Sequence, residues 1–298
     1  MSLSTDPLDL KQLDANALDH LDEDQLQRLL GGVKIPPRPE LLMALQEEKY
    51  KEEPSLSRIA KLIGQDVGLT AAVLKCVNSP VFGLSSKLLS APHAVTFMGL
   101  KGTFNLTTAL LLKQTFEDDP GLHRFWDSSS EIARLGSYLA RQLGNANADE
   151  MYLLGLFHDS AIPLMIRQLP GYRQLWGSRR GNGPQLVQQE ERRYQTGHPV
   201  IGYLMAREWG LPQTVRHAIL DHHRADWILD DSKQTPEPHH SLLANLKLAE
   251  HMEGLINELV DGEWPHIREQ VQGSLGLSDL DLDDLIADMQ EMLLDQDD

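Results

Sequence analysis

Cysteine and aromatic residues are scarce in this chain of 298 residues. The single cysteine, Cys76, excludes an internal disulfide and indicates a reducing compartment. It follows the apolar run Ala71-Ala72-Val73-Leu74, so we expect a buried thiol. Aromatic residues make up 6% of the sequence, which predicts a core built mainly from Leu, Ile, Val, Ala and Met.

Long apolar runs and positive charge are also lacking. No apolar stretch approaches the roughly 20 residues that span a bilayer, and the first residues, MSLSTD, lack the basic start of a signal peptide. The formal net charge is −17. Affinity for DNA or for anionic membranes depends on Lys and Arg that neutralise phosphates. We therefore expect a cytoplasmic protein without membrane association, and the charge disfavours a nucleic-acid partner.

The alternation of apolar and polar residues that marks β-strands is not sustained anywhere. Apolar residues instead recur at helical spacing. Ser55 and Asp66 are suitable N-caps for two successive helices, and a further helix begins near Ser90 and ends near Gly99. The sequence predicts an all-α fold. In the second half we expect helices over residues 124–143, 150–169, 185–195, 199–209, 212–222, 240–258 and 264–271.

Breaks in the helical pattern divide the chain into four predicted segments. Residues 1–34 form an acidic N-terminal helix and linker, in which Gly31-Gly32 ends the helix, and the stiff connector PPRP follows at residues 36–39. Residues 35–120 form a first helical half, which ends at the sequence DDPG, and residues 121–272 form a second helical bundle. Residues 273–298 form an acidic amphipathic tail, which either packs on its own chain or binds a partner as a helix.

Histidine and acidic residues carry the chemical signal. His158 and Asp159 are adjacent in the sequence LLGLFHD, and imidazole and carboxylate groups are good ligands for transition metals. Further histidines follow at the ends of predicted helices, from which they can converge inside a helical bundle. They are His198, His222, His223, His239 and His240. The alternative interpretation is that some of them are solvated loop residues or simply favour a helix C-terminus.

Three stretches resemble the HDOD family in order and spacing: IGQDVGLTA from Ile63, LKCVNSPVFGL from Leu74 and AVTFMGLKG from Ala94. The resemblance covers residues 35–258. Its second half is similar to the HD superfamily of metal-dependent phosphohydrolases, and implies two packed helical subdomains, the second an HD-phosphohydrolase-like helical bundle. It also implies a role in bacterial signal transduction with signalling protein partners in trans.

The same resemblance implies a metal-ligand set that is degenerate in this chain. His158 and Asp159 match the family's HD doublet, and Ser128 stands where the first metal-binding histidine is expected. Glu250 replaces the distal aspartate. The remaining matched positions are His198, His222 and His223. The glycine and lysine that usually follow the doublet are replaced by Ala161 and Ile162.

Because the first ligand is missing, the sequence favours a non-catalytic signal-transduction module that acts through protein or ligand binding, with no cofactor. The alternative is a metal-dependent phosphohydrolase with an altered metal site, a nucleotide or cyclic-dinucleotide phosphodiesterase, which would hold a divalent ion such as Fe, Mn, Ni or Zn. A small-molecule or nucleotide ligand is compatible with either. A third hypothesis is a structural adaptor that works through its acidic ends.

Overall fold

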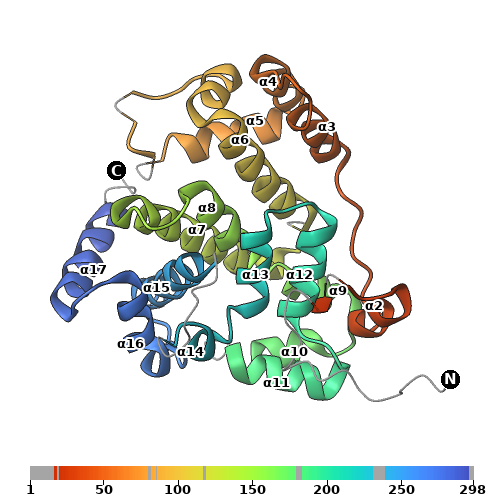
Figure 1. The fold of residues 1–298 in the computed structure, drawn as a ribbon, viewed down its shortest axis with the longest axis vertical. Helices are drawn as coiled ribbons and strands as arrows, with labels where there is room; N and C mark the ends of the chain where they lie inside the picture. The colour runs from red at the N-terminus through yellow and green to blue at the C-terminus, as the bar shows by residue number, and fades with distance from the viewer. Residues whose placement is uncertain are drawn as a thin grey trace.

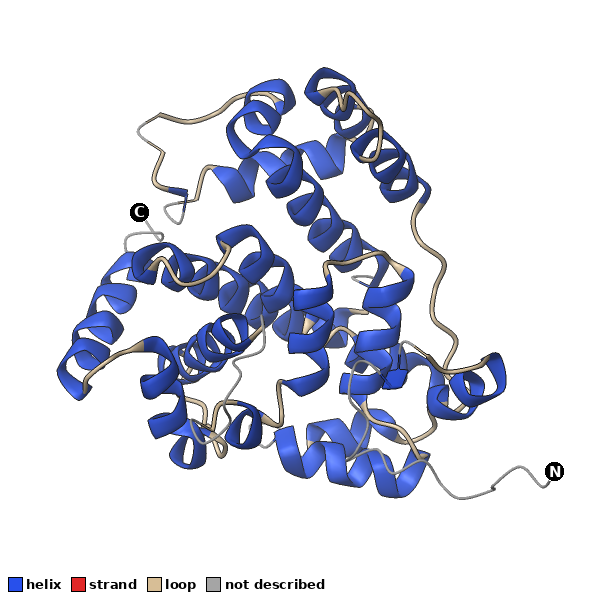
Figure 2. Ribbon diagram, in the orientation of Figure 1, coloured by secondary structure: helices blue, strands red, loops and turns tan. Residues whose placement is uncertain are grey.

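The computed structural model describes residues 17–18, 20–79, 82–84, 86–116, 119–178, 183–230 and 239–294, with side chains up to Met289. Every regular element in these ranges is a helix, which confirms the predicted all-α class (Figure 2). None of these helices has both the length and the apolarity of a membrane span.

The helices of the first half form the upper part of the molecule in Figure 1, and one long helix runs from them down into the rest. Ser55 and Asp66 accept hydrogen bonds from backbone N–H groups of the helices that follow them, as predicted. The long helix α6 is bent at Gly99, whose φ of 70° is left-handed, and this confirms the predicted helix end. The elements are α3 (Glu40–Lys49), α4 (Leu56–Gly64), α5 (Val67–Val77) and α6 (Ala91–Phe116).

The second half forms a larger bundle, in which α15 packs against α7 and α8. One buried core contains residues of both halves, from Val33 to Met289. Trp126 and Trp209 are fully buried in it. The elements are η3 (Pro120–Leu122), α7 (His123–Leu143), α8 (Ala148–Phe157), α9 (Ala161–Gln168), α10 (Tyr172–Gly177), α11 (Gly183–Tyr194), α12 (His198–Glu208), α13 (Gln213–Asp221), α14 (Ala225–Ile228), α15 (His240–Ile256) and α16 (Trp264–Leu275).

One predicted helix, over residues 150–169, is wrong. The chain leaves the helix after Phe157, turns through His158, Asp159 and Ser160, and starts α9 at Ala161. Pro163 explains the restart, because a proline fits the first turn of a helix, where its missing N–H has no partner to lose. The break places the HD doublet at a turn between two helices.

The two acidic ends both pack on the body of the chain where they are described. Helix α2 (Glu23–Leu30) begins at the capping residue Asp22, which corrects the prediction of one continuous N-terminal helix. Leu29 and Leu30 of α2 form a small core with residues of α12. At the other end, α17 (Asp279–Leu294) buries Leu282 and Met289 in the main core. This favours the interpretation that the tail packs on its own chain.

Several predicted features lie outside the described residues: the first part of the N-terminal segment, residues 1–16, and Pro80 and Val81 of the motif LKCVNSPVFGL. Phe82, which is described, is buried. The segment boundaries after residues 34, 120 and 272 stay predictions.

Candidate metal centre

The HD doublet is held at its turn by a close approach of two helices. Gly155 of α8 lies so near α7 that an added Cβ would stand 2.4 Å from the Cα of Ala133. Only glycine permits this distance between backbones. Three residues later, the Nδ1–H of His158 donates to the carbonyl of Gly155 at 2.8 Å. The contact therefore fixes both the position of the turn and the orientation of the His158 ring.

His198 enters the centre from the first residue of α12. The buried carboxylate of Glu190, on α11, accepts hydrogen bonds from both the backbone N–H and the Nδ1–H of His198, each at 2.8 Å. The hydroxyl of Tyr172 also donates to Glu190. Both side chains of the Glu190–His198 pair are fully buried. The Nε2 atom of His198 is thus the ring atom that faces Asp159, at 3.3 Å from its Oδ1.

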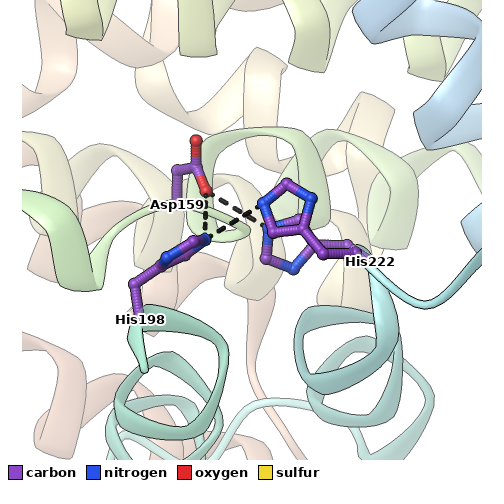
Figure 3. A group of neighbouring side chains, drawn as sticks. Asp159, His198 and His222 are labelled. Atoms are coloured by element: carbon purple, nitrogen blue, oxygen red, sulfur yellow. Dashed lines mark hydrogen bonds and ion pairs between the residues drawn. The ribbon is translucent and has the colours of Figure 1, made fainter. Parts of the chain in front are cut away.

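His222 and His223 come from the C-terminal end of α13. His222 donates from Nδ1 to the carbonyl of Ile219 at 2.7 Å, and its Nε2 lies 3.2 Å from Asp159 Oδ1. His223 places Nδ1 at 3.3 Å from Glu263 Oε2 and Nε2 at 3.1 Å from His198 Nε2. Figure 3 shows the rings of His198 and His222 directed at the Asp159 carboxylate from neighbouring helices.

Four side chains therefore form what we call the histidine cluster: Asp159, His198, His222 and His223. One ligand atom of each lies within 4.8 Å of those of the other three. His158 lies at the other oxygen of the Asp159 carboxylate, with Glu250 beside it. His158 Nε2 is 3.6 Å from Asp159 Oδ2 and 3.4 Å from Glu250 Oε1. All six residues predicted as ligands are thus brought together, four in the cluster and two beside it.

The electrostatics of the cluster suit a cation. Burial alone would raise the pKa of Asp159, but its electrostatic interaction with the His158 ring and hydrogen bonds from His198 and His222 hold the pKa well below its ordinary value. Burial, with the charge of nearby groups, lowers the pKa of His222 and His223, so both rings are neutral. Burial also lowers the pKa of His198, but the Glu190 carboxylate outweighs this and raises it to about 10. A metal would displace a proton from that ring.

The donor set fits a transition metal. Three imidazole nitrogens and one carboxylate oxygen match the ligands and number that Zn²⁺ and related ions take in proteins. Each of the three rings has its Nδ1 on an acceptor oxygen and its Nε2 turned inward, the arrangement that orients metal-binding histidines. The cluster lies at a cavity of about 750 Å³, which His158, Asp159, His198, His223, Glu250 and Ser128 help to line.

Ser128 lies in this cavity, where the first metal-binding histidine was expected from the resemblance. Its hydroxyl hydrogen-bonds to Glu253 of α15. Of the two further histidines considered in the sequence, His239 is buried and pairs with Asp221 at 3.0 Å. His240 begins α15. Neither belongs to the histidine cluster.

Sequence reasoning missed three polar residues of the centre: Glu190, Lys247 and Glu263. Glu190 follows Leu186 by one helical turn, and a carboxylate on the apolar face of a helix is a signal of a buried partner. Lys247 stands between two leucines of an apolar helix, which likewise indicates a buried charge with a partner. Glu263 lies in a loop, where no such pattern in the sequence marks a buried charge.

The fold and the centre define this chain as an all-helical protein with an HD doublet at a turn and histidines directed at its aspartate. Comparison with known proteins identifies the family. The HDOD domain matches residues 35–225, and the chain belongs to the HDOD family. An uncharacterized protein of Treponema pallidum is 28% identical over 250 residues, 81% of this chain and 45% of its own length. Protein YuxH of Bacillus subtilis, also uncharacterized, is 26% identical over 44% of this chain and 32% of its own. The chain thus spans less than half the length of these curated relatives.

Solved structures share the fold. An HDOD domain protein of unknown function from Geobacter sulfurreducens is 21% identical, with a TM-score of 0.64 over 92% of this chain and 96% of its own. A candidate phosphohydrolase from Shewanella amazonensis is 21% identical, with a TM-score of 0.65 over 89% and 94%. At this identity the likeness establishes the fold alone.

Proposed function

We propose that this chain is a non-catalytic signalling module whose histidine cluster binds one divalent transition-metal ion and whose adjoining cavity binds a ligand or a partner segment. The observation that carries the metal is the set of three Nε2 atoms turned toward one ionised carboxylate, with each Nδ1 held by an acceptor oxygen. When bound, such an ion supplies Lewis acidity and a fixed point that joins three helix ends.

The protein residues support binding rather than turnover. Ser128 supplies a hydroxyl where an HD phosphohydrolase has an imidazole, so the site has one strong nitrogen donor fewer and His158 is the imidazole that faces Asp159 Oδ2. The described lining of the cavity is also rich in carboxylates, among them Asp127, Glu131 and Glu253, and Arg124 is its one Arg or Lys. These carboxylates disfavour the phosphate groups of a nucleotide substrate.

A metal-dependent phosphohydrolase is the second candidate. It is favoured by one observation, the position of the histidine cluster at a cavity large enough for a nucleotide-sized molecule. One structural neighbour from Shewanella amazonensis is described as a candidate metal-dependent phosphohydrolase, which is consistent with this alternative.

The test compares the full chain with Asp159→Asn, after each is loaded with Mn²⁺, Fe²⁺, Ni²⁺ or Zn²⁺. Hydrolysis of bis(p-nitrophenyl) phosphate and of cyclic dinucleotides is measured together with the metal content. We expect one ion per chain in the parent protein and no hydrolysis above the level of the Asp159→Asn variant. Hydrolysis that disappears in Asp159→Asn would establish the phosphohydrolase instead.

A further inference from the structure

A buried lysine lies beside the histidine cluster. Lys247, on α15, has 1% of its side chain exposed, and its Nζ atom stands 2.7 Å from Glu250 Oε2 and 3.2 Å from Glu263 Oε2. A lysine is almost never buried without such partners. Burial acts to lower the pKa of its ammonium group, but the two carboxylates outweigh burial and raise it above the ordinary value, so the group is charged.

Both partners of Lys247 are also partners of the centre's histidines. Glu250 presents Oε1 to His158 Nε2 at 3.4 Å, and Glu263 presents Oε2 to His223 Nδ1 at 3.3 Å. His158 in turn faces Asp159 Oδ2, while His198 and His222 of the histidine cluster face Oδ1 of the same carboxylate. The ammonium group therefore lies between Glu250, which contacts His158, and Glu263, which contacts His223 of the histidine cluster. We call the group formed by His158, Glu250 and Glu263 the carboxylate side.

The carboxylate side has the groups of a cation site and already holds a cation. The Glu250 and Glu263 carboxylates meet there around one positive charge, and Glu250 also contacts the His158 imidazole, which faces Asp159 Oδ2. A second divalent ion would have to compete with a buried ammonium group whose attraction to its carboxylates is strong in this low-dielectric setting.

We propose that Lys247 is the resident cation of the carboxylate side and limits the centre to a single metal ion. This inference builds on the proposed function, since the single ion is the one assigned to the histidine cluster. It gives the lysine a specific role: its ammonium group neutralises Glu250 and Glu263 and keeps the centre from becoming a two-metal site. Removal of the charge converts the carboxylate side into a second metal site.

The experiment counts ions in metal-free full-length proteins titrated with Mn²⁺, with free ion followed by electron paramagnetic resonance and bound ion by mass spectrometry after dialysis. Four proteins are compared: the parent chain, Lys247→Met, Lys247→Arg and Lys247→Met combined with Glu250→Gln. Met keeps the length of the side chain without its charge, and Arg keeps the charge. We expect one, two, one and one ion per chain, with magnetic coupling between the ions only in Lys247→Met.

The outcomes separate this inference from the proposed function. If the parent chain binds no ion and Lys247→Met binds one that Glu250→Gln removes, the histidine cluster fails as a metal site while the role of Lys247 stands. Equal ion counts in the parent and in Lys247→Met overturn the inference, as does an added ion that persists with Glu250→Gln. If Lys247→Met fails to fold, judged by circular dichroism, Lys247→Gln takes its place, because its amide can donate to Glu250 and Glu263 without supplying a charge, and it must still gain an ion relative to the parent.

Discussion

The Glu190 carboxylate and the His198 imidazole form a fully buried pair, with Nδ1 donating to the carboxylate at 2.8 Å. The same carboxylate also accepts the backbone N–H of His198, at the start of α12. Two hydrogen bonds from one residue therefore fix both the position and the rotation of the ring. Glu190 is a positioning residue, since it orients the metal-binding nitrogen without reaching the metal position itself.

We predict that Glu190→Gln weakens metal affinity by about 10- to 100-fold, the usual cost of removing a group that orients a metal-binding histidine. Gln keeps the size of the side chain but loses the charge that supports His198. Affinity is measured by competition with a chromophoric chelator. Glu269→Gln, on the exposed face of α16, is the matched control and should leave the affinity unchanged. Equal affinity in the parent and in Glu190→Gln would show that the pair is only structural.

The Gly155–Ala133 contact predicts a loss of stability. In Gly155→Ala the new Cβ meets the Cα of Ala133 at 2.4 Å and its backbone nitrogen at 2.7 Å, so α7 and α8 must separate. We expect the free energy of unfolding to fall by about 1–3 kcal/mol, as for other overpacked cores. Urea denaturation measures it.

Gly64→Ala, at the end of α4, is the control for this prediction, because nothing lies within 4 Å of the added Cβ. It should leave stability unchanged or raise it by up to about 1 kcal/mol. A similar stability change in the two variants would contradict the close packing at Gly155.

The buried thiol of Cys76 should make the stability of the fold depend on pH in the alkaline range. Burial raises the pKa of this thiol from 9.0 to about 11. Between these values the folded chain keeps a proton that the unfolded chain releases, so stability falls as pH rises through about 9 to 11, by ~2 kcal/mol in total. The measurement is urea denaturation at pH 8 and pH 11 for the parent and for Cys76→Ala. The parent should lose more stability than the variant, and an equal loss in both would contradict a buried, protonated thiol.

The sequence predicted the helical class, the N-caps at Ser55 and Asp66 and the bend at Gly99, because each depends on local chemistry that the residue itself carries. It placed one helix over residues 150–169, since the apolar spacing continues through the HD turn, and Pro163 was the signal that marked the break. These helix boundaries were therefore predicted correctly from local residues, except where a turn lies inside a continuous apolar run.

The centre was predictable only in part. Histidine, aspartate and glutamate are common metal ligands, so residue type together with the family resemblance was enough to find the six candidate ligands. Glu190 and Lys247 act through the packing of one helix or loop on another, and those contacts cannot be read from the spacing of residues along the sequence. The division of the six residues into four that form the histidine cluster and two that lie beside it is likewise a result of geometry.

The central claim is that the histidine cluster, rather than the HD doublet alone, binds one metal ion. The most direct measurement is metal content by mass spectrometry on full-length protein purified without chelator, compared with His222→Ala and His158→Ala. The account predicts about one transition-metal ion per chain in the parent, none in His222→Ala, and an ion that remains in His158→Ala. A parent protein that holds no more metal than His222→Ala, before and after incubation with Zn²⁺ or Mn²⁺, would contradict it.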